Sequence, residues 1–401
     1  MPHQDGPLCS INDVIHGLQR LSPTEIAIVN HLFFQRLRGI KQTGFCEFHA
    51  PSATHTRFEH SLGVVAMATR MLNALFANAG ANQDKLVPWN VRHQHENVGV
   101  DVRGIRASDR AWLYEHTRYA ALVHDLGHGP FSHVFEVFLP TFDEAQHLLN
   151  DPRIKKLRPL IEAWRAQHPK EQRLTHEILS CILFTVIWRE IHGKKRLSAA
   201  AQRVPLVVSA VLLGLANDSS AELLKLSPER RELLPLLSEI ISSAPADADR
   251  IDYLLRDQRA MGTKLAAFDT ERILKSLLAV RVGDGLHVGW KRSGLIALEQ
   301  FMQARYAMFV EMYGHKTNEA ASLMLGTVHA AYTRATLTSP VSTSDLDAFL
   351  RTFTGLSDER FLGFIAGTDG SSPDLFRVRA IGRALQQRTL WRCVFDTAMQ
   401  V

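Results

Sequence analysis

The chain has 401 residues, of which 46% are hydrophobic and 22% charged, and its formal net charge is +5. This composition is typical of a folded globular protein with a sizeable core, and it excludes a largely disordered chain. The net charge is too small to make nucleic acid the primary expected ligand, although it is compatible with an anionic ligand such as a phosphate ester.

The N-terminal residues MPHQDGPLCS show no charged-then-apolar signal pattern. The longest apolar run, residues 204–216, is too short to span a bilayer. The cysteines form no CxxC pair, which is typical of reduced thiols; they are Cys9, Cys46, Cys181 and Cys393. We therefore expect a cytoplasmic protein that makes no contact with a membrane.

Helical periodicity dominates the chain. Apolar residues recur at three- and four-residue spacing in residues 119–126, 176–191, 231–243 and 294–314. Strand signals are sparse, and the best of them is residues 278–290, where two short alternating runs flank Gly-Asp-Gly. The sequence therefore predicts a mostly α-helical protein with a small β element, a hairpin near residues 278–290.

The domain organisation follows from changes in composition along the chain. Residues 79–110 are polar, rich in Gly and Asn and weakly periodic, so they are predicted to form an inserted loop. No linker long enough to divide the chain is present. We expect one large helical domain over residues 1–335, followed by a C-terminal helical extension over residues 336–401.

Two segments bring histidines into apolar surroundings. In HTRFEHSLGV (residues 55–64), Arg57 and His60 are three residues apart and share a face if the segment opens a helix. In YAALVHDLGHGPFSHVFE (residues 119–136), His124 adjoins Asp125, and His128 is expected one helical turn later on the face of His124. A buried polar group needs a partner, and a metal ion would supply one.

A third segment, PADADRIDYLLRD, supplies Asp249, followed at four-residue steps by Tyr253 and Asp257. Alone, His60 is more often a core residue than a ligand, and Asp249 would serve as an ordinary helix cap. In combination, two imidazoles and two carboxylates from separate helices suit a divalent first-row metal with open positions for water and substrate.

The chain resembles the HD-domain metal-dependent phosphohydrolases, and within them the deoxynucleoside triphosphate triphosphohydrolases. The resemblance is carried, in chain order, by DVIHGLQRLSP, FFQRLRGIKQTG, THTRFEHSLGV, HDLGHGPFSHVFE, THE, DADRIDYLLRD and YGHK. It runs from about residue 11 to 320 and implies an HD-domain helical fold with an HD-type phosphohydrolase core over residues 1–335. The reaction it implies releases deoxynucleoside and intact inorganic triphosphate from a dNTP.

The resemblance also implies a role for individual residues. One divalent ion (Mn, Mg, Fe, Co, Ni or Zn) would be held by His60, His124, Asp125 and Asp249. The remaining histidines are candidate ligands for a second ion. The catalytic group around the phosphate would orient the nucleophile and move protons; it comprises His128, His133, His176 and Glu136, the last standing where relatives have an aspartate.

Substrate-binding positions follow from the same resemblance. The β- and γ-phosphates would be bound by Arg57, Arg250 and Tyr253, with a further phosphate contact from Arg305. The sugar would be read by Gln42 and Asp257 at its 3′-hydroxyl and by Tyr313 against C2′. Arg305 and Tyr313 recur with Phe309 at four-residue steps, so we expect these three on one helix face. Simpler alternatives are an ion pair for Arg305 and a core position for Tyr313.

Two other classes of function stay open. The same metal chemistry could act on another phosphoester: a nucleoside monophosphate, a cyclic or signalling nucleotide, or a single-stranded nucleic-acid end. A non-catalytic HD protein that senses nucleotides or binds nucleic acid is the third hypothesis. The expected partners are a dNTP substrate and further copies of the chain in a homo-oligomer, with nucleic acid secondary and no membrane.

Overall fold

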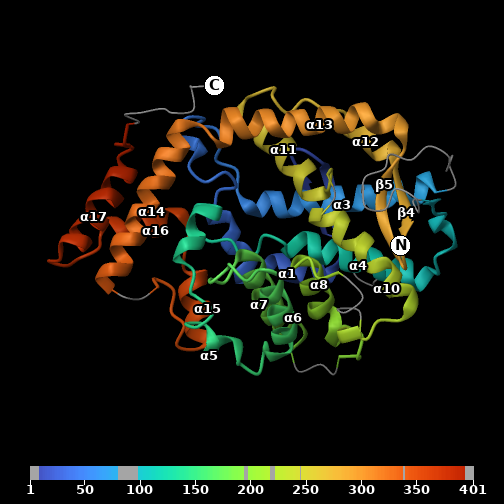
Figure 1. The fold of residues 1–401 in the computed structure, drawn as a ribbon, viewed down its shortest axis with the longest axis horizontal. Coiled ribbons are helices and arrows are strands. Elements are labelled where there is room, and N and C mark those ends of the chain that lie inside the picture. Colours follow the sequence, from blue (N-terminus) through green and yellow to red (C-terminus); the bar gives the residue numbers. More distant parts are fainter. Residues whose placement is uncertain are drawn as a thin grey trace.

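A computed structural model of the chain describes residues 9–79, 98–193, 197–216, 222–243, 245–336 and 339–392. Helices dominate it, and two small antiparallel sheets are its β structure, so the predicted fold class is confirmed (Figure 1). The helices are α1 (Pro23–Asn30), α2 (Leu32–Gln35), α3 (Arg57–Asn78), α4 (Ala107–Val123), α5 (Gln146–Leu149), α6 (Arg158–Gln167), α7 (His176–His192), α8 (Val204–Leu212), α10 (Pro228–Ser238), α11 (Ala248–Met261), α12 (Thr270–Ser276), α13 (Leu295–Met308), α14 (Lys316–Thr336), α15 (Leu346–Thr354), α16 (Asp358–Ala366) and α17 (Pro373–Gln386).

The helix α3 runs through the middle of the molecule and packs against α4 and α11 (Figure 1). Most of its side chains are buried, from Arg57 in the first turn to Phe76 near the end. Its glycine, Gly63, faces α11, where a Cβ atom would lie 2.0 Å from a carboxylate oxygen of Asp252. The missing side chain therefore lets the two helices approach closely.

The predicted hairpin is present as β4 (Leu277–Val282) and β5 (Gly285–Trp290), paired in antiparallel register with Val282 opposite Gly285. Gly283 in the turn has a φ of +56°, which glycine adopts without strain. Strand β3 (Val98–Gly99) adds to the free edge of β4.

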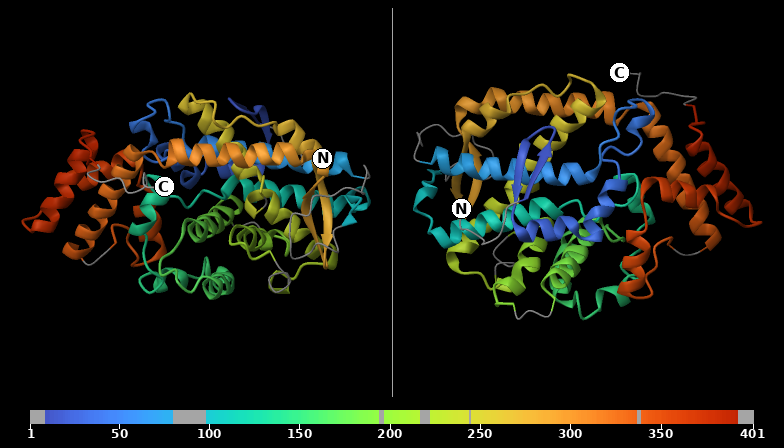
Figure 2. Two further views of the ribbon diagram at one scale, coloured as in Figure 1. Left: turned by 45° about the horizontal axis from the view of Figure 1, so that its top comes forward. Right: turned by 180° about the vertical axis from the view of Figure 1, so that it is seen from behind.

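A second hairpin, β1 (Cys9–Asp13) and β2 (Gly17–Leu21), was not predicted. It lies across α3 on the face hidden in Figure 1, as the rear view in Figure 2 shows. Its strands are five residues each and lack a clean alternation of apolar side chains, so no periodic signal marked them.

Of the predicted insertion at 79–110, residues 80–97 lie outside the described residues. The rest forms β3, the short helix η4 (Val102–Gly104) and the start of α4. Towards the C-terminus, α17 packs on α14 and α16, and α15 packs on α5 (Figure 1). The division at residue 335 stays a prediction. Among the described residues, no helix has the length and apolarity needed to cross a membrane.

Candidate metal centre and active site

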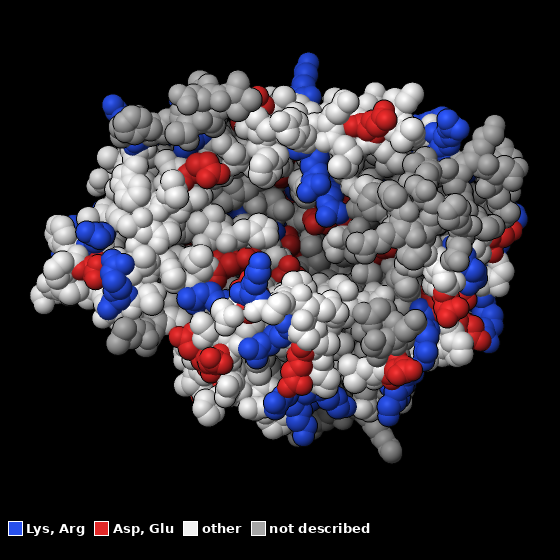
Figure 3. All heavy atoms as spheres, viewed as in Figure 1, with Lys and Arg blue, Asp and Glu red and all other residues white. Residues whose placement is uncertain are grey.

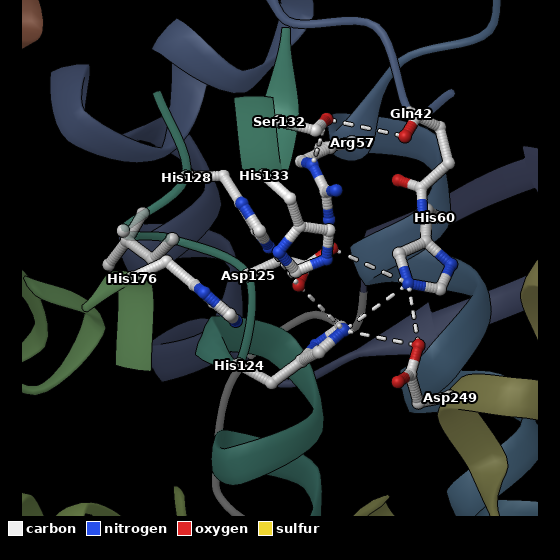
Figure 4. Close-up of polar contacts among 12 residues, drawn as sticks. Gln42, Arg57, His60, His124, Asp125, His128, Ser132, His133, His176 and Asp249 are labelled. Carbon is white, nitrogen blue, oxygen red and sulfur yellow. Dashed lines mark hydrogen bonds and ion pairs between the residues drawn. The ribbon is translucent and has the colours of Figure 1, made fainter. Parts of the chain in front are cut away.

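The four predicted metal ligands come from three elements and point towards one another (Figure 4). His60 lies in the first turns of α3, and Asp249 lies in the first turn of α11. His124 and Asp125 follow directly after the last residue of α4. Each helix end places its ligand at the same point, where α3, α4 and α11 meet.

We expected the His124–His128 segment to be helical, and this expectation is wrong. Helix α4 ends at Val123, and the chain continues in tight turns, with the His128 amide donating to the Asp125 carbonyl. The reason is the approach of α7: a Cβ atom on Gly127 would lie 2.0 Å from the carbonyl oxygen of His176. The turn places His128 beside Asp125, with 3.3 Å between Nε2 and Oδ1.

Distances within the set are short. His60 Nε2 lies 3.0 Å from Asp249 Oδ1, 3.2 Å from His124 Nε2 and 3.5 Å from Asp125 Oδ2. His124 Nε2 lies 3.3 Å from Asp125 Oδ1 and 3.6 Å from Asp249 Oδ1. Metal bonds of about 2.0–2.2 Å to nitrogen and oxygen place neighbouring ligand atoms roughly 3 Å apart, so His60, His124 and Asp125 lie close enough together to hold one ion, with Asp249 beside the two histidines.

Both imidazoles are oriented through their Nδ1 atoms. His124 Nδ1 lies 2.8 Å from the Ala121 carbonyl oxygen, which can only accept, so Nδ1 carries the proton. His60 Nδ1 lies 2.8 Å from Asp252 Oδ2 and donates to that carboxylate. The two Nε2 atoms therefore face each other at 3.2 Å, so each ring presents to its neighbour the nitrogen that a metal ion would bind in place of a proton.

The electrostatics also favour a cation. Burial would lower the pKa of His60, but hydrogen bonds to Asp249 and Asp252 and the charge of Asp125 raise it to about 10. The pKa of Asp249 is lowered despite burial, because His124 and His60 bond to it. Despite burial, the pKa of Asp125 is also lowered, chiefly by the charge of Arg57, so the carboxylates of Asp125 and Asp249 are both ionised at neutral pH.

A second cluster adjoins the first and contains the four predicted catalytic residues. Glu136 Oε1 accepts from His176 Nδ1 at 2.6 Å and lies 3.1 Å from His133 Nδ1. The rings of His128 and His176 stack with 3.8 Å between centroids. His133 lies on the short helix η5 (Ser132–Phe138) with 68% of its side chain exposed, so it is the most exposed member of the cluster.

The stacked histidines differ in pKa. Burial lowers the pKa of His128 far below its ordinary value, and the nearby Arg57 guanidinium lowers it further. Burial also acts on His176, but the carboxylates of Glu177 and Glu136 outweigh it and raise the pKa. The pKa of Glu136 is lowered to about 2, since hydrogen bonds from both histidines outweigh its burial. Neighbouring groups with separated pKa values are typical of acid–base sites.

Arg57 and Gln42 lie on either side of Ser132 (Figure 4). Arg57 is buried, pairs with the Asp125 carboxylate and donates through Nε to Ser132 Oγ at 2.9 Å. The Gln42 carbonyl oxygen accepts from Ser132 Oγ at 3.3 Å, and its side-chain oxygen is buried with no hydrogen-bond partner in the structure. The arginine is therefore fixed next to the metal ligands.

The predicted phosphate-binding residues of α11 lie beside those of α13. Arg250 contacts the carboxylate of Asp247, the residue that caps α11. The pKa of Tyr253 is raised to about 12, chiefly by burial and by the nearby Asp249, while Arg305 on α13 opposes the rise. The structure therefore brings Arg250, Tyr253 and Arg305 close together.

Tyr313 donates to Asp257 Oδ2 at 2.6 Å, and His55 Nε2 lies 2.7 Å from the other carboxylate oxygen. The expected single helix face does not exist, because α13 ends at Met308 and a wide turn, η10 (Phe309–Tyr313), follows it. This π-helical turn shifts the register, so Phe309 is 65% exposed while Tyr313 reaches Asp257.

Several residues that complete the site were missed by sequence reasoning. Asp252 and Asp247 stand within the recognised DADRIDYLLRD motif, where their acidity was the available signal. His16 lies 2.6 Å from Asp252, and Arg256 donates to the same carboxylate at 3.0 Å. Their contacts join residues as far as 236 positions apart, which no local pattern reveals.

Comparison with known proteins finds distant relatives in sequence. The chain is 28% identical over 401 residues to the deoxynucleoside triphosphate triphosphohydrolase SAMHD1 of Bos taurus, with 96% of this chain and 58% of that protein aligned. It is 24% identical over 370 residues to a putative HD domain-containing protein of Acanthamoeba polyphaga mimivirus, with 90% of this chain and 64% of that protein aligned. It is 28% identical over 315 residues to an uncharacterized protein of Methanocaldococcus jannaschii (79% and 48%). No family model matches the chain. The chain thus spans between about half and two thirds of these relatives.

Proposed function

We propose that this chain, a distant relative of the HD-domain deoxynucleoside triphosphate triphosphohydrolases, is a metal-dependent phosphohydrolase that converts dNTPs to deoxynucleosides and inorganic triphosphate. The observation that carries the proposal is the pair of imidazole Nε2 atoms that face each other at 3.2 Å between two carboxylates. This arrangement is more typical of a cation-binding site than of histidines packed in a hydrophobic core.

One divalent ion would be held by His60, His124, Asp125 and Asp249. When bound, such an ion lowers the pKa of a water ligand and polarises a phosphoryl oxygen. Two imidazoles and two carboxylates accept several first-row metals and Mg²⁺, so the donor set leaves the identity of the metal open.

The chain's own residues would bind and orient the substrate. Arg57, already held by Asp125 and Ser132, would contact a phosphate next to the metal. Arg250, Tyr253 and Arg305, which lie together, would bind the outer phosphates. Tyr313, held by Asp257, would pack against C2′ of the sugar, leaving no space for a ribose 2′-hydroxyl, while Gln42 and Asp257 would contact the 3′-hydroxyl.

Proton transfer would be carried out by the second cluster, which comprises His128, His133, His176 and Glu136. His128 is buried and neutral, and with the His176–Glu136 pair it would orient the attacking water. His133, exposed and backed by Glu136, would donate a proton to the departing 5′-oxygen. The water oxygen would then be part of the inorganic triphosphate, and the 5′-oxygen would leave as the hydroxyl of the deoxynucleoside.

The face of the molecule in Figure 3 is hollowed near its middle, and both acidic and basic side chains surround the hollow. Mixed charge suits a small metal-bound nucleotide better than a long polyanion, which needs a continuous basic surface. Nucleic acid is therefore a secondary candidate partner. We also propose a cytoplasmic location, where the free thiols of Cys9, Cys46 and Cys181 would stay reduced.

A homo-oligomer is a further part of the proposal. Large apolar side chains are exposed along α13 and the turn that follows it: Ile296 (70%), Met302 (44%), Tyr306 (72%) and Phe309 (65%). Met302, Tyr306 and Phe309 recur at steps of four and three residues, and exposed large apolar side chains grouped in this way are typical of a protein–protein contact. Sedimentation analysis of the wild type and Phe309→Ser is expected to show a smaller assembly for the variant.

The test is a panel of all dNTPs and NTPs incubated with Mn²⁺ or Mg²⁺, with products separated by ion exchange. We expect inorganic triphosphate from dNTPs but not from NTPs, and no product from His124→Ala. His147→Ala, which changes an exposed histidine on α5, serves as the matched control and should retain activity. Pyrophosphate or orthophosphate as product would show cleavage of a phosphoanhydride bond and contradict the proposed reaction, and no turnover would favour another phosphoester substrate or a sensor.

A further inference from the structure

We propose that Asp358, in the C-terminal helical part of the chain, is a positioning residue for the active site. Its buried carboxylate joins two backbone segments that carry residues expected to contact the substrate. This inference rests on the proposed function, since the residues it positions are those of the proposed phosphate and sugar contacts. It assigns to α16 a part in the site that lies outside the sequence region of the family resemblance.

The geometry is that of one carboxylate bridging two backbone amides. Asp358 is the first residue of α16 and is 2% exposed. Its Oδ1 accepts from the Phe131 amide at 2.8 Å, and its Oδ2 accepts from the Lys41 amide at 3.0 Å. Both oxygens are thereby occupied by segments that are 90 residues apart in sequence. Charge-assisted bonds of this kind are stronger than bonds between neutral groups.

The segment at Phe131 needs such support. Phe131 and Ser132 have φ values of +58° and +60°, in the left-handed region that residues with side chains rarely adopt. Such conformations persist where the surroundings hold them in place. Here Asp358 holds the Phe131 amide, and the Phe131 ring stacks on Phe45 with 4.3 Å between centroids.

The left-handed turn sets the position of Ser132, which contacts Arg57 on α3 and the segment at Lys41. Its hydroxyl accepts from Arg57 Nε at 2.9 Å and donates to the Lys41 carbonyl oxygen at 2.9 Å. His133 follows Ser132 directly, and Gln42 follows Lys41 directly. Three residues of the proposed site, Arg57, His133 and Gln42, are therefore tied to one carboxylate through short links.

A second contact from the C-terminal helices supports the same arrangement. The buried Arg36 guanidinium lies over the Phe353 ring of α15, 4.4 Å from its centroid, and donates to the Leu126 carbonyl oxygen at 2.7 Å. Leu126 directly follows the metal ligand Asp125. Close packing continues at Gly39, where a Cβ atom would lie 2.8 Å from Ser357 Cβ. The C-terminal helices thus contact the segment between His124 and His133 directly at Phe131, and they contact it at Leu126 through Arg36.

The test compares Asp358→Asn with Glu359→Gln in the full-length, metal-loaded protein. The asparagine keeps the size of the side chain, but its amide nitrogen donates and cannot accept from a second backbone N–H. Glu359 is exposed in the same first turn of α16, so its change removes an equal charge from the helix start and leaves the bridge intact. Ser132→Ala interrupts the same link at Arg57 and serves as the second variant if Asp358→Asn fails to fold.

Two readouts are measured on each variant: hydrogen exchange of the Lys41 and Phe131 amides, and kcat and KM for dNTP hydrolysis at equal Mn²⁺ occupancy. We expect faster exchange at both amides in Asp358→Asn. We expect kcat to fall by about 10- to 100-fold in Asp358→Asn and Ser132→Ala, since small displacements of catalytic groups cost that much. Glu359→Gln should match the wild type in both readouts.

The proposal and the proposed function fail in different ways. If wild-type protein hydrolyses no dNTP while Asp358→Asn loosens the two amides, the proposed function is wrong and the bridging role of Asp358 stands. If the two amides exchange equally in Asp358→Asn and Glu359→Gln, the bridge is wrong whatever the activity. Loosened amides with an unchanged kcat would overturn the positioning role.

Discussion

Asp252 contacts three buried side chains at once: His60, His16 and Arg256. Because Asp252 accepts from His60 Nδ1, the other ring nitrogen, Nε2, is the one that would bind a metal ion. We predict that Asp252→Asn weakens Mn²⁺ binding by about 10- to 100-fold, because partners that orient a metal-ligating histidine typically have effects of that size. Isothermal titration with Mn²⁺ measures the change.

Asp257→Asn is the matched control for that experiment. Asp257 lies on the same helix and is equally buried, but it contacts His55 and Tyr313 instead of a metal ligand. Its Mn²⁺ affinity should equal that of the wild type. Equal affinities in all three proteins would show that Asp252 does not act on the metal site.

The ion pair between Glu136 and His176 affects the pH at which His176 loses its proton. The pKa of Glu136 is lowered to about 2, so the carboxylate is ionised at every pH at which the protein would be assayed. Its charge contributes to the raised pKa of His176. We therefore predict that Glu136→Gln lowers the pKa of His176, because the cationic form loses a partner, and NMR titration of labelled histidine measures it. Glu171→Gln, an exposed change, should leave the titration unaltered, and a higher pKa in Glu136→Gln would contradict the assignment.

Several site residues were predictable from sequence for a physical reason. His124 and Asp125 are adjacent, and His60 and Asp249 stand in motifs that open helices, so local spacing already indicates convergence. His16 and Asp358 could not be found in this way. Each acts only through contacts with residues that are more than 200 positions distant.

At the scale of elements, the crossing of α3 and α11 depends on Gly63. A Cβ atom there would lie 2.0 Å from Asp252 Oδ1 and 2.2 Å from an Arg256 guanidinium nitrogen. We predict that Gly63→Ala lowers the free energy of unfolding by about 1–3 kcal/mol, as overpacking of a buried contact does. It should also weaken Mn²⁺ binding, because Asp252 must move.

Gly326→Ala provides the control, since Gly326 is exposed in α14 and a Cβ atom there meets nothing within 4 Å. That change should raise the free energy of unfolding by about 0.5–1 kcal/mol, through helix propensity alone. Thermal and urea unfolding compare the two variants. If both stabilise the protein, the close approach of α3 and α11 at Gly63 is not required.

Elements with strong periodicity were predictable, and those set by tertiary contacts were not. The β4–β5 hairpin was marked by Gly-Asp-Gly between alternating runs. The early end of α4 and the π turn after α13 both interrupt apolar patterns that continue smoothly in the sequence. At α4 the interruption comes from packing of Gly127 against α7, which the pattern does not contain.

At the scale of the molecule, the mostly α-helical architecture followed from periodicity, but the contribution of the C-terminal helices to the site did not. Composition and spacing identify α15 and α16 as amphipathic helices without indicating what they cover. The structure packs them against the segments that carry Arg36, Lys41 and Phe131. Contacts with the proposed catalytic residues and their neighbours therefore come from both sides of the predicted boundary near residue 335.

The most direct test is dNTP hydrolysis in water enriched in oxygen-18, followed by mass spectrometry of both products. In the proposed reaction, His60, His124, Asp125 and Asp249 would hold a metal ion that lowers the pKa of a bound water, and that water would attack the α-phosphorus. We therefore predict one oxygen-18 atom in the inorganic triphosphate and none in the deoxynucleoside. Label in the deoxynucleoside, pyrophosphate with a nucleoside monophosphate, or no turnover of any dNTP with Mn²⁺ or Mg²⁺ would contradict this mechanism.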